Sequence, residues 1–350
     1  MTDDMKTQVT VIIPTYRRPQ LLRRAIKSVL GQTYFNLKVC IYDNASGDET
    51  ADVVAAMAKE DPRISYHCHS VNIGGGENFK SGMQDVTTSF FSFLSDDDVL
   101  LPEFIEMALA GFEKDPDAML SSLSAIVMTT DRMVDDVPVL AWPREGVYYP
   151  PEGVLEMIKK PMTWTSILFR KEIIDAVGIL DVETGGLSDF DYELRAAIRF
   201  PIVISKQPGA IFFSHADSVS GRTNMDHYWP RWEVMTKKIR IDEGVSKAYR
   251  GQVENALNIF FCKILVSMAI KAMVQEQRHE IQRIAEVMSF YLHREVLAVA
   301  LRSTGWLCLM PGLPKLIARL ADMRRDVNRS KKKGDWHGYD YNDYLNSLES

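Results

Sequence analysis

Short, almost purely apolar runs alternate with helical segments along the first hundred residues, and this alternation constrains the fold more than any other feature. The first run, Val9–Ile13, is rich in β-branched residues, as is typical of a strand buried on both faces of a parallel sheet. The pattern predicts strands at Val9–Ile13, Val39–Tyr42, Ile64–His67 and Phe90–Leu94, and helices from Pro19 to Gly31, at Asp48–Ala58 and after Gly74–Gly76. Strands and helices at this spacing form βαβ units with right-handed crossovers. We therefore expect an α/β fold of the nucleotide-binding type, with a mostly parallel central sheet.

The pattern is more mixed after Pro102. The sequence predicts a helix through Phe112, strands at Ser121–Met128 and Trp164–Phe169, a polar loop at Asp131–Pro151 and a helix at Asp189–Phe200. From about Tyr228, long helical patterns follow with few turn signals. We expect a first domain over residues 1–227, divided near residue 100 into a nucleotide-binding half and a second half, and a helical region over residues 228–350.

Composition and charge exclude several classes of protein. The chain has 350 residues, enough to bury a large core. Its formal net charge of −6 argues against a general nucleic-acid binder, which carries a basic stripe to neutralise phosphates. The four cysteines lie far apart in the sequence, so neither a disulfide framework nor a thiolate zinc site is indicated.

The sequence also indicates where the protein resides. Met1–Gln8 lacks the apolar core of a signal peptide. No stretch reaches the roughly 18 uncharged apolar residues that are typical of a spanning helix. We expect a cytoplasmic protein.

Three consecutive carboxylates follow the last strand of the first half. Asp96, Asp97 and Asp98 come directly after Phe90–Leu94, at the edge of the sheet where open α/β folds bind ligands. Adjacent carboxylates repel one another, so a strand end that carries them usually holds a cation. Asp96 and Asp98 can turn to the same side, and a divalent ion held there keeps positions free for phosphate oxygens. The alternative is an acidic solvent loop or a helix cap.

A second acidic pair, Asp189 and Asp191, falls in the first turn of a predicted helix. Alone, the pair fits helix capping, because carboxylates at this end accept hydrogen bonds from free amides and oppose the helix dipole. Combined with Gly185-Gly186 and the three aspartates, Asp189 becomes a candidate general base, since an attacking hydroxyl must lose its proton to a group within reach. Only the geometry decides between the two interpretations.

Two further loops follow strands at the same edge. Asp43 closes the second strand, where its carboxylate either accepts hydrogen bonds from a base or ribose or nucleates a turn. Gly74–Gly76 could let a ligand approach the backbone. This glycine run matches neither the GxGxxG fingerprint nor a phosphate-binding loop that ends in GK[ST].

Taken in order, these motifs resemble those of the family-two inverting glycosyltransferases with a GT-A fold. The resemblance rests on Val11–Arg18, Asp43–Thr50, Asn72–Gly74 and Phe93–Asp98, and it covers about Val9–Ser220. It implies a GT-A fold and the transfer of a sugar from a nucleotide-diphosphate donor, with UDP as the default nucleotide. It also implies Mn²⁺ or Mg²⁺ as the cofactor.

The resemblance implies roles for individual residues. Asp98 would ligate the metal, and His215 would complete its shell; Asp189 would be the catalytic base; Asp191 and Trp164 would bind the acceptor. The donor would be bound by Pro14, Tyr16 and Arg18 around the base, by Asp43 at the base, by Asp96 at the ribose or sugar, and by Thr15, Asn72, Gly74 and Asp97.

The sequence departs from the family pattern at two places. Ser188 precedes Asp189 where the family usually has a glutamate, which bears on acceptor binding or on the pKa of the base. Glu77–Lys80 stands where many members have an arginine-asparagine pair, which bears on donor specificity.

The predicted function is transfer of a sugar, with inversion, to a hydroxyl of a saccharide or of a lipid-linked saccharide, in the biosynthesis of polysaccharides or glycoconjugates. A sugar nucleotidyltransferase is the nearest competing enzyme, but it would carry a glycine-rich basic loop after its first strand, whereas Pro14–Arg18 contains no glycine. A non-catalytic protein that binds a nucleotide sugar is the other alternative.

The late part of the chain leaves two alternatives open. The apolar face Leu257–Met268 either packs on the first domain or forms the interface of a homo-oligomer. After Pro311, apolar residues alternate with basic ones as far as Lys333. This segment could lie on an anionic bilayer as a peripheral contact at the inner face of the cell membrane, or it could be a solvated tail.

Overall fold

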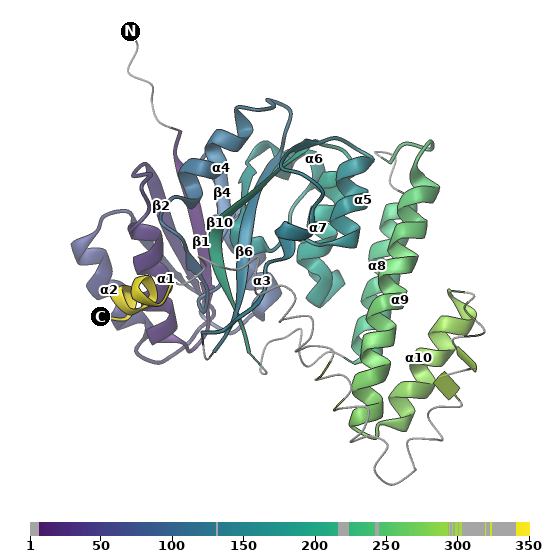
Figure 1. Cartoon of the computed structure of the whole chain (residues 1–350). Coiled ribbons are helices and arrows are strands. Elements are labelled where there is room, and N and C mark those ends of the chain that lie inside the picture. Colours follow the sequence, from purple (N-terminus) through teal and green to yellow (C-terminus); the bar gives the residue numbers. More distant parts are fainter. Residues whose placement is uncertain are drawn as a thin grey trace. The chain divides into compact units, whose positions relative to one another are not determined.

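The fold is seen in a computed structural model of the chain (Figure 1). The structure describes residues 7–130, 132–215, 224–241, 245–292 and 341–350, and the single residues 294, 296, 298, 299, 301, 302, 319 and 323. The chain divides into two compact units, one comprising Met1–Ala216 with Tyr339–Ser350 and the other Asp217–Gly338. The division differs from the expected one because the end of the sequence belongs to the first unit.

The first hundred residues form the alternating pattern that the sequence predicts. The elements are β1 (Val9–Thr15), α1 (Pro19–Leu30), β2 (Leu37–Asp43), α2 (Thr50–Glu60), β3 (Ile64–Cys68), α3 (Gly75–Gln84) and β4 (Phe90–Phe93). β1 pairs in parallel with β2 and with β4, and β2 pairs in parallel with β3. The predicted α/β architecture is therefore confirmed, and the first four strands form a parallel sheet.

The remaining strands of the first unit extend this sheet with mixed directions. They are β5 (Val99–Leu100), β6 (Leu120–Thr129), β7 (Val134–Asp136), β8 (Gly146–Tyr148), β9 (Ile167–Arg170) and β10 (Ile202–Ser214). Within the described residues the sheet runs β3-β2-β1-β4-β9-β6-β10-β5, with β7 beside β6 and β8 beside β10. β9 lies antiparallel between β4 and β6, so the sheet is mixed beyond β4.

Three local features of this half differ from the expected elements. The predicted polar loop Asp131–Pro151 contains two short strands, β7 and β8. Trp164 lies in a 3-10 turn, η2 (Trp164–Ser166), before β9. β10 was not predicted because Pro208 and Gly209 interrupt its apolar pattern, and the register shifts around Pro208.

Five further helices and two 3-10 turns complete the described part of the first unit, in addition to η2. They are α4 (Phe104–Phe112), α5 (Glu152–Lys159), α6 (Glu172–Val177), α7 (Ser188–Ala197) and α13 (Asn342–Glu349), with 3-10 turns η1 (Pro138–Ala141) and η3 (Val182–Leu187).

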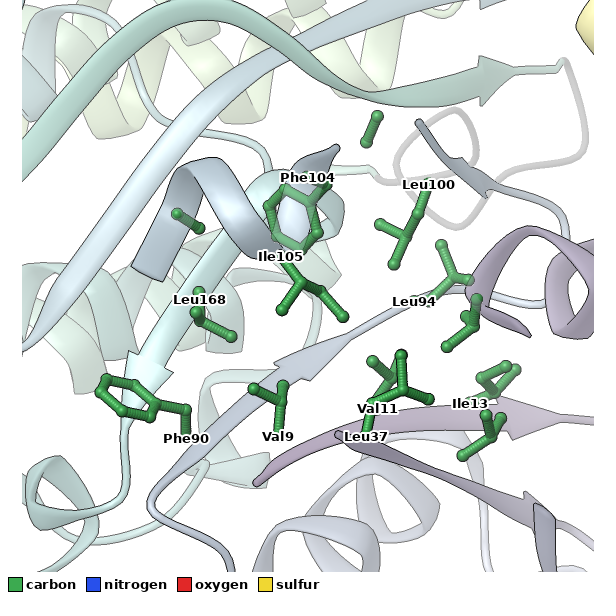
Figure 2. Close-up of a cluster of buried hydrophobic side chains, with 14 of the residues drawn as sticks. Val9, Val11, Ile13, Leu37, Phe90, Leu94, Leu100, Phe104, Ile105 and Leu168 are labelled. Atoms are coloured by element: carbon green, nitrogen blue, oxygen red, sulfur yellow. The ribbon is translucent and has the colours of Figure 1, made fainter. Parts of the chain in front are cut away.

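One face of the sheet packs against α1, α2 and α4. Val9, Val11 and Ile13 alternate along β1 and point into one buried cluster with Phe104 and Ile105 of α4 (Figure 2). Side chains two apart on a strand share a face, so this spacing assigns the intervening residues to the opposite face. The β-branched run of β1 is therefore buried on both sides, as predicted.

The opposite face packs closely against α3 and carries an aromatic cluster. A Cβ built on Gly82 of α3 would lie 2.4 Å from Ile12 Cγ2, so only glycine lets α3 approach β1 this closely. Further along, Phe93 stacks on Trp164 with ring centroids 4.8 Å apart, and Trp164 meets Tyr192 of α7 edge to face. This cluster joins β4, η2 and α7.

The second unit is helical. Its described helices are α8 (Met225–Ile241), α9 (Arg250–Val274) and α10 (Arg278–Phe290). Trp232 of α8 stacks on Phe261 of α9 with ring centroids 4.4 Å apart, and Ile281 of α10 packs on Ala272 and Met273. The predicted apolar face of α9 therefore packs at least partly within this unit.

By length and composition alone, α9 could cross a membrane, and within the described residues it is the one helix that could. A core helix of a soluble protein passes the same test, and a third of the apolar window of α9 is buried. The predicted basic segment after Pro311 lies outside the described residues, except for Arg319 and Met323.

Candidate active site

The polar residues that the sequence singles out gather at the carboxyl edge of the parallel strands. The β1–β2 register places Thr15 beside Asp43 and Pro14 beside Tyr42. The acidic loop, Ser95–Asp98, follows β4, the other neighbour of β1. Carboxyl ends of parallel strands meet at one edge, and here they bring together three motifs that are far apart in the sequence.

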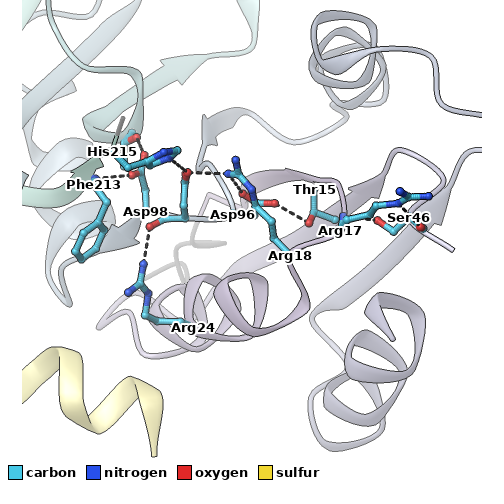
Figure 3. A network of polar contacts seen from close by, with 11 residues as sticks. Thr15, Arg17, Arg18, Arg24, Ser46, Asp96, Asp98, Phe213 and His215 are labelled. Carbon is cyan, nitrogen blue, oxygen red and sulfur yellow. Dashed lines mark hydrogen bonds and ion pairs between the residues drawn. The ribbon is translucent and has the colours of Figure 1, made fainter. Parts of the chain in front are cut away.

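Asp96 is held by Thr15, the last residue of β1, and by Arg18 in the segment that follows (Figure 3). Thr15 Oγ1 donates to Asp96 Oδ2 at 2.8 Å, and Arg18 Nη1 donates to Asp96 Oδ1 at 3.2 Å. Burial raises the pKa of Asp96 to about 6, against the lowering effect of Thr15 and Arg18. The loops after β1 and β4 are thus joined by charge-assisted hydrogen bonds.

Asp97 connects the acidic loop to the end of β10. Its Oδ2 accepts a hydrogen bond from Arg18 Nη1 at 2.8 Å and lies 2.9 Å from His215 Nε2. Both side chains are partly exposed, at 15% for Asp97 and 23% for His215. A carboxylate oxygen and an imidazole nitrogen therefore lie together where a ligand can reach them.

Asp98 does not present its carboxylate to this space, contrary to its predicted role as the metal ligand. It is fully buried. Oδ2 accepts a hydrogen bond from Thr165 Oγ1 at 2.6 Å, and Oδ1 accepts one from the Phe213 amide at 2.9 Å. Burial, followed by the charge of Asp97, raises the pKa of Asp98 well above its usual range. Its geometry suits a structural link between the acidic loop, η2 and β10.

Asp43 fixes the loop between β2 and α2. Its Oδ1 accepts hydrogen bonds from the Ser46 amide and hydroxyl at 2.9 and 2.6 Å, and its Oδ2 accepts one from Tyr66 at 2.5 Å. Ser46 in turn accepts a hydrogen bond from the Arg17 amide at 2.8 Å. Ser46 therefore joins the loops after β1 and β2.

The remaining predicted donor-binding residues border the same loops. Asn72 is exposed and accepts hydrogen bonds from the Gly74 amide at 2.9 Å and from Asn44 Nδ2 at 3.1 Å. Gly74 has φ +88° at the start of α3, a conformation that favours glycine. Tyr16 is exposed, whereas Pro14 is buried within β1.

Asp189 lies in the first turn of α7, as predicted, and is exposed. Protein surrounds its carboxyl closely enough for desolvation to raise its pKa. One turn later, Glu193 is almost fully buried, and burial followed by the charge of Asp189 raises its pKa well above the usual range. Glu193 was not predicted as a site residue, although its four-residue spacing from Asp189 places the two side chains on one side of the helix.

Contacts through η2 connect α7 to the acidic loop. Thr165 binds Asp98, and the neighbouring Trp164 packs against Tyr192 of α7. On the other side, a Cβ at Gly76 would lie 3.3 Å from Val182, the residue that starts η3 just before α7. The N-terminal end of α7 therefore belongs to the same region as the acidic loop and the start of α3. Trp164, predicted to bind the acceptor, is half-buried here.

Asp191 does not fit its predicted role in acceptor binding. It is fully buried and accepts a hydrogen bond from Arg195 Nε at 2.8 Å. Arg195 also donates to the carbonyls of Val177 and Ile179. The Asp191 carboxylate anchors α7 to the loop after α6, because its position two residues from Asp189 turns it toward the interior of the protein.

Arg24 is a further contributor that sequence analysis missed. This buried residue of α1 donates from Nη2 to the Asp97 carbonyl at 2.6 Å and lies 4.4 Å from the ring centroid of Phe213. A basic residue in an amphipathic helix resembles a solvent-facing charge, so no local signal pointed to this contact.

The donor atoms fit a hard divalent cation only in part. No group of three His, Cys, Asp or Glu side chains forms a complete cation site in the described part of the chain. Asp97 and His215 supply one oxygen and one nitrogen. Mg²⁺-type sites commonly take one or two protein carboxylates and fill the remaining positions with phosphate oxygens and water, and this pair is compatible with such a site.

Comparisons with known proteins agree with this geometry. Residues 10–178 match the family model described as glycosyl transferase family 2. A β-1,3-glucosyltransferase of Campylobacter jejuni, which acts on GalNAc(5)-diNAcBac-PP-undecaprenol, is 37% identical over 95 residues, covering 27% of this chain and 31% of the relative. Chondroitin synthase of Escherichia coli is 32% identical over 127 residues, covering 36% of this chain and 18% of the relative. The chain thus matches less than a third of the length of either protein.

Solved structures share the fold over most of the chain. S. aureus TarS residues 1–349 in complex with UDP-GlcNAc superimposes with a TM-score of 0.65 at 15% identity, covering 93% of this chain and 92% of that one. A mannosyltransferase from Pyrobaculum calidifontis in complex with GDP-Man and Mn²⁺ gives a TM-score of 0.54 at 14% identity, covering 93% and 87% of the two chains. At these identities the likeness concerns the fold alone.

Proposed function

We propose that the chain is an inverting, metal-dependent glycosyltransferase, because residues 10–178 match the model of glycosyl transferase family 2. It moves a sugar from a nucleotide-diphosphate donor to a hydroxyl of a saccharide or lipid-linked saccharide. We expect the donor to be a UDP-sugar. The observation that carries the proposal is the connected network of Thr15, Arg18, Asp96, Asp97 and His215 at the sheet edge. UDP-GlcNAc bound to a protein of the same fold, and the undecaprenol-linked acceptor in the name of a relative, support the donor and acceptor classes.

The donor lies along the loops after β1, β2 and β3 in this proposal. Tyr16 offers an exposed ring for the base, and Asn72 lies in the loop between β3 and α3. Asp43 acts by fixing the loop through Ser46 and Tyr66. Arg18 pairs with Asp96 and Asp97 and keeps both carboxylates at the place where the ribose and diphosphate would lie.

Asp97 and His215 would hold the metal in place of Asp98. These two side chains are partly exposed and already share a contact of 2.9 Å, whereas Asp98 is buried with both oxygens engaged. When bound, Mn²⁺ or Mg²⁺ supplies positive charge against the diphosphate of the leaving nucleotide.

Asp189 is the general base. It accepts the proton of the acceptor hydroxyl as that oxygen forms a bond to the anomeric carbon and the bond from this carbon to the diphosphate oxygen breaks. A single displacement of this kind inverts the anomeric configuration. Trp164, close to α7 through Tyr192, offers an apolar surface for the acceptor sugar.

A nucleotide-release assay tests the proposal. The full chain is incubated with UDP-sugars and GDP-sugars in MnCl₂ or in EDTA, with the binding of UDP measured in parallel by thermal shift. We expect Mn²⁺-dependent release from one donor and stabilisation by its nucleotide. Release that is indifferent to EDTA would contradict the metal site, and the absence of both binding and release would contradict the function.

A cytoplasmic location with peripheral membrane contact, and self-association through the late helices, remain predictions. The basic segment that would contact lipid falls largely outside the described residues. Deleting residues 312–333, which retains α13 in the chain, and measuring binding to anionic liposomes tests the membrane contact.

A further inference from the structure

The helix α13 packs on the first unit, although about 120 residues of the second unit precede it in the sequence. Leu345 and Leu348 of α13 are buried. Arg132 donates to Asn346 and Glu349 at 2.6 Å each. The helix is therefore held in place by buried leucines on one side and by hydrogen bonds from Arg132.

α13 contacts the segment that follows the acidic loop. Tyr344 Oη donates to the carbonyl of Leu100 at 2.8 Å. Leu100 belongs to β5, directly after Asp98 and Val99, and its amide donates to Ser28 Oγ of α1 at 3.1 Å. The downstream end of the acidic loop is thus held between α1 and α13.

A second route runs through Arg24. Glu349 Oε1 lies 3.5 Å from Arg24 Nη1, while Arg24 Nη2 donates to the Asp97 carbonyl. The Arg24 side chain is 10% exposed, and Glu349 provides the largest electrostatic compensation for the burial of its guanidinium. A buried cation without a counter-charge is costly, so the carboxylate of α13 helps to keep Arg24 against the loop.

Arg24 also touches the other half of the metal-binding pair. Its guanidinium lies over the ring of Phe213, two residues before His215, and the Phe213 amide binds Asp98. Arg24 thus contacts the backbone that carries Asp97 and the strand that leads to His215. Both contacts bear on the distance between the two proposed ligands.

We propose that α13 is a positioning element of the donor site: Glu349 through Arg24, and Tyr344 through Leu100, hold Asp97 opposite His215. The role attributed to Asp97 and His215 rests on the proposed function. The positioning contacts themselves come from residues that would not touch the donor.

Isothermal titration of UDP into the full chain, with MnCl₂ and with EDTA, tests the inference. Glu349→Gln and Tyr344→Phe each remove one route. Glu349 is about half exposed, so its pair with Arg24 is screened by solvent. We expect each variant to weaken the Mn²⁺-supported affinity for UDP by about twofold to fivefold, and the double variant to weaken it further. Affinity in EDTA should stay within about twofold of wild type.

Ser347→Ala is the matched control, because Ser347 is exposed on α13 and its hydroxyl donates to the Tyr344 carbonyl within the same helix. It should bind UDP like wild type, and Glu349→Asp should recover part of the lost affinity. Wild-type affinity in the double variant, or an equal loss in Ser347→Ala, would overturn the inference. Equal losses in MnCl₂ and EDTA would also overturn it, since they would indicate only a loosened fold. If wild-type chain binds no UDP under either condition, the proposed function itself fails.

Discussion

At the scale of single residues, the site is built from carboxyl groups in different surroundings. Asp97 is partly exposed beside His215, whereas Asp98 and Asp191 are fully buried and bonded to neighbours. The sequence correctly predicted which runs of acids gather at the sheet edge. The buried positions of Asp98 and Asp191 were not predicted, because alternation along an irregular loop or a helix turn does not reveal which carboxylate meets a hydroxyl or guanidinium partner.

Replacing Asp189 with asparagine tests the base. We expect transfer to fall by about 10²- to 10⁴-fold, while binding of UDP with Mn²⁺ stays within about twofold, because α7 keeps its shape. An Asp189→Asn enzyme that retains more than about a tenth of wild-type kcat would exclude this role.

The same residue predicts the acidic limb of the pH profile. Desolvation raises the pKa of Asp189 above its ordinary value, and only the ionised form can accept a proton. Activity should therefore begin to fall, as pH decreases, at a higher pH than an ordinary aspartate would give. The measurement is kcat/KM against pH, with Mn²⁺ saturating at each point. A fall in kcat/KM that begins only near the pKa of an ordinary aspartate would contradict the prediction.

Glu193 predicts a pH dependence of stability. Its folded-state pKa is raised by burial and by Asp189, so its contribution to stability is complete below the unfolded pKa and is lost as pH rises through the folded pKa. Glu193→Gln has no such charge, and its free energy of unfolding should decline less than that of wild type as pH rises from the acidic to the alkaline side of neutrality. Denaturant titrations measure this difference. Glu172→Gln, at an exposed position of α6, should follow wild type, and parallel behaviour of all three proteins would show that Glu193 ionises freely.

At the scale of elements, regular patterns were predictable and interrupted ones were not. β1 to β4 and the helices between them follow their apolar periodicity. β10 escaped prediction because Pro208 and Gly209 break its pattern, and the short β7 and β8 depend on pairing with strands that are distant in sequence. The antiparallel pairing of β9 between β4 and β6 likewise depends on contacts between distant segments, which local sequence patterns do not show.

The close packing of α3 on β1 gives a prediction at this scale. Gly82→Ala would place a methyl group against Ile12 and Tyr42, and overpacking of this kind should lower the free energy of unfolding by about 1–3 kcal/mol. Gly251→Ala, where no described residue beyond the neighbouring backbone of the same helix lies within 4 Å of the added Cβ, should leave stability unchanged or slightly higher. Equal effects of the two substitutions in urea titrations would show that α3 adjusts without strain.

At the scale of the whole molecule, the sequence predicted a sheet-containing part followed by a helical part. It did not predict that residues 339–350 belong with the first part. The eight residues of α13 carry no motif, and their place is decided by contacts with Arg132, Arg24 and Leu100. Such contacts between remote segments are invisible to periodicity.

The two units predict two responses to heat. At UDP and Mn²⁺ concentrations near 100 times Kd, linkage adds about 2.7 kcal/mol to the folded state of the unit that binds them, which raises its Tm by roughly 5–10 °C for a unit of this size. In calorimetry, we expect the transition of the first unit to move and that of the helical unit to stay. An equal shift in the Tm of both transitions would contradict this prediction, because it would show that both units bind the ligand or that they unfold together.

The discontinuity of the first unit affects the order in which a ribosome can complete it. The strands and loops that would receive the nucleotide emerge early, but Tyr344 and Glu349 follow only after the helical unit has been synthesised. A nascent chain would thus carry its acidic loop without two of its supporting contacts until translation has passed residue 349. The ability to bind the donor would therefore arise late in synthesis, and chains released before that point would bind the donor more weakly.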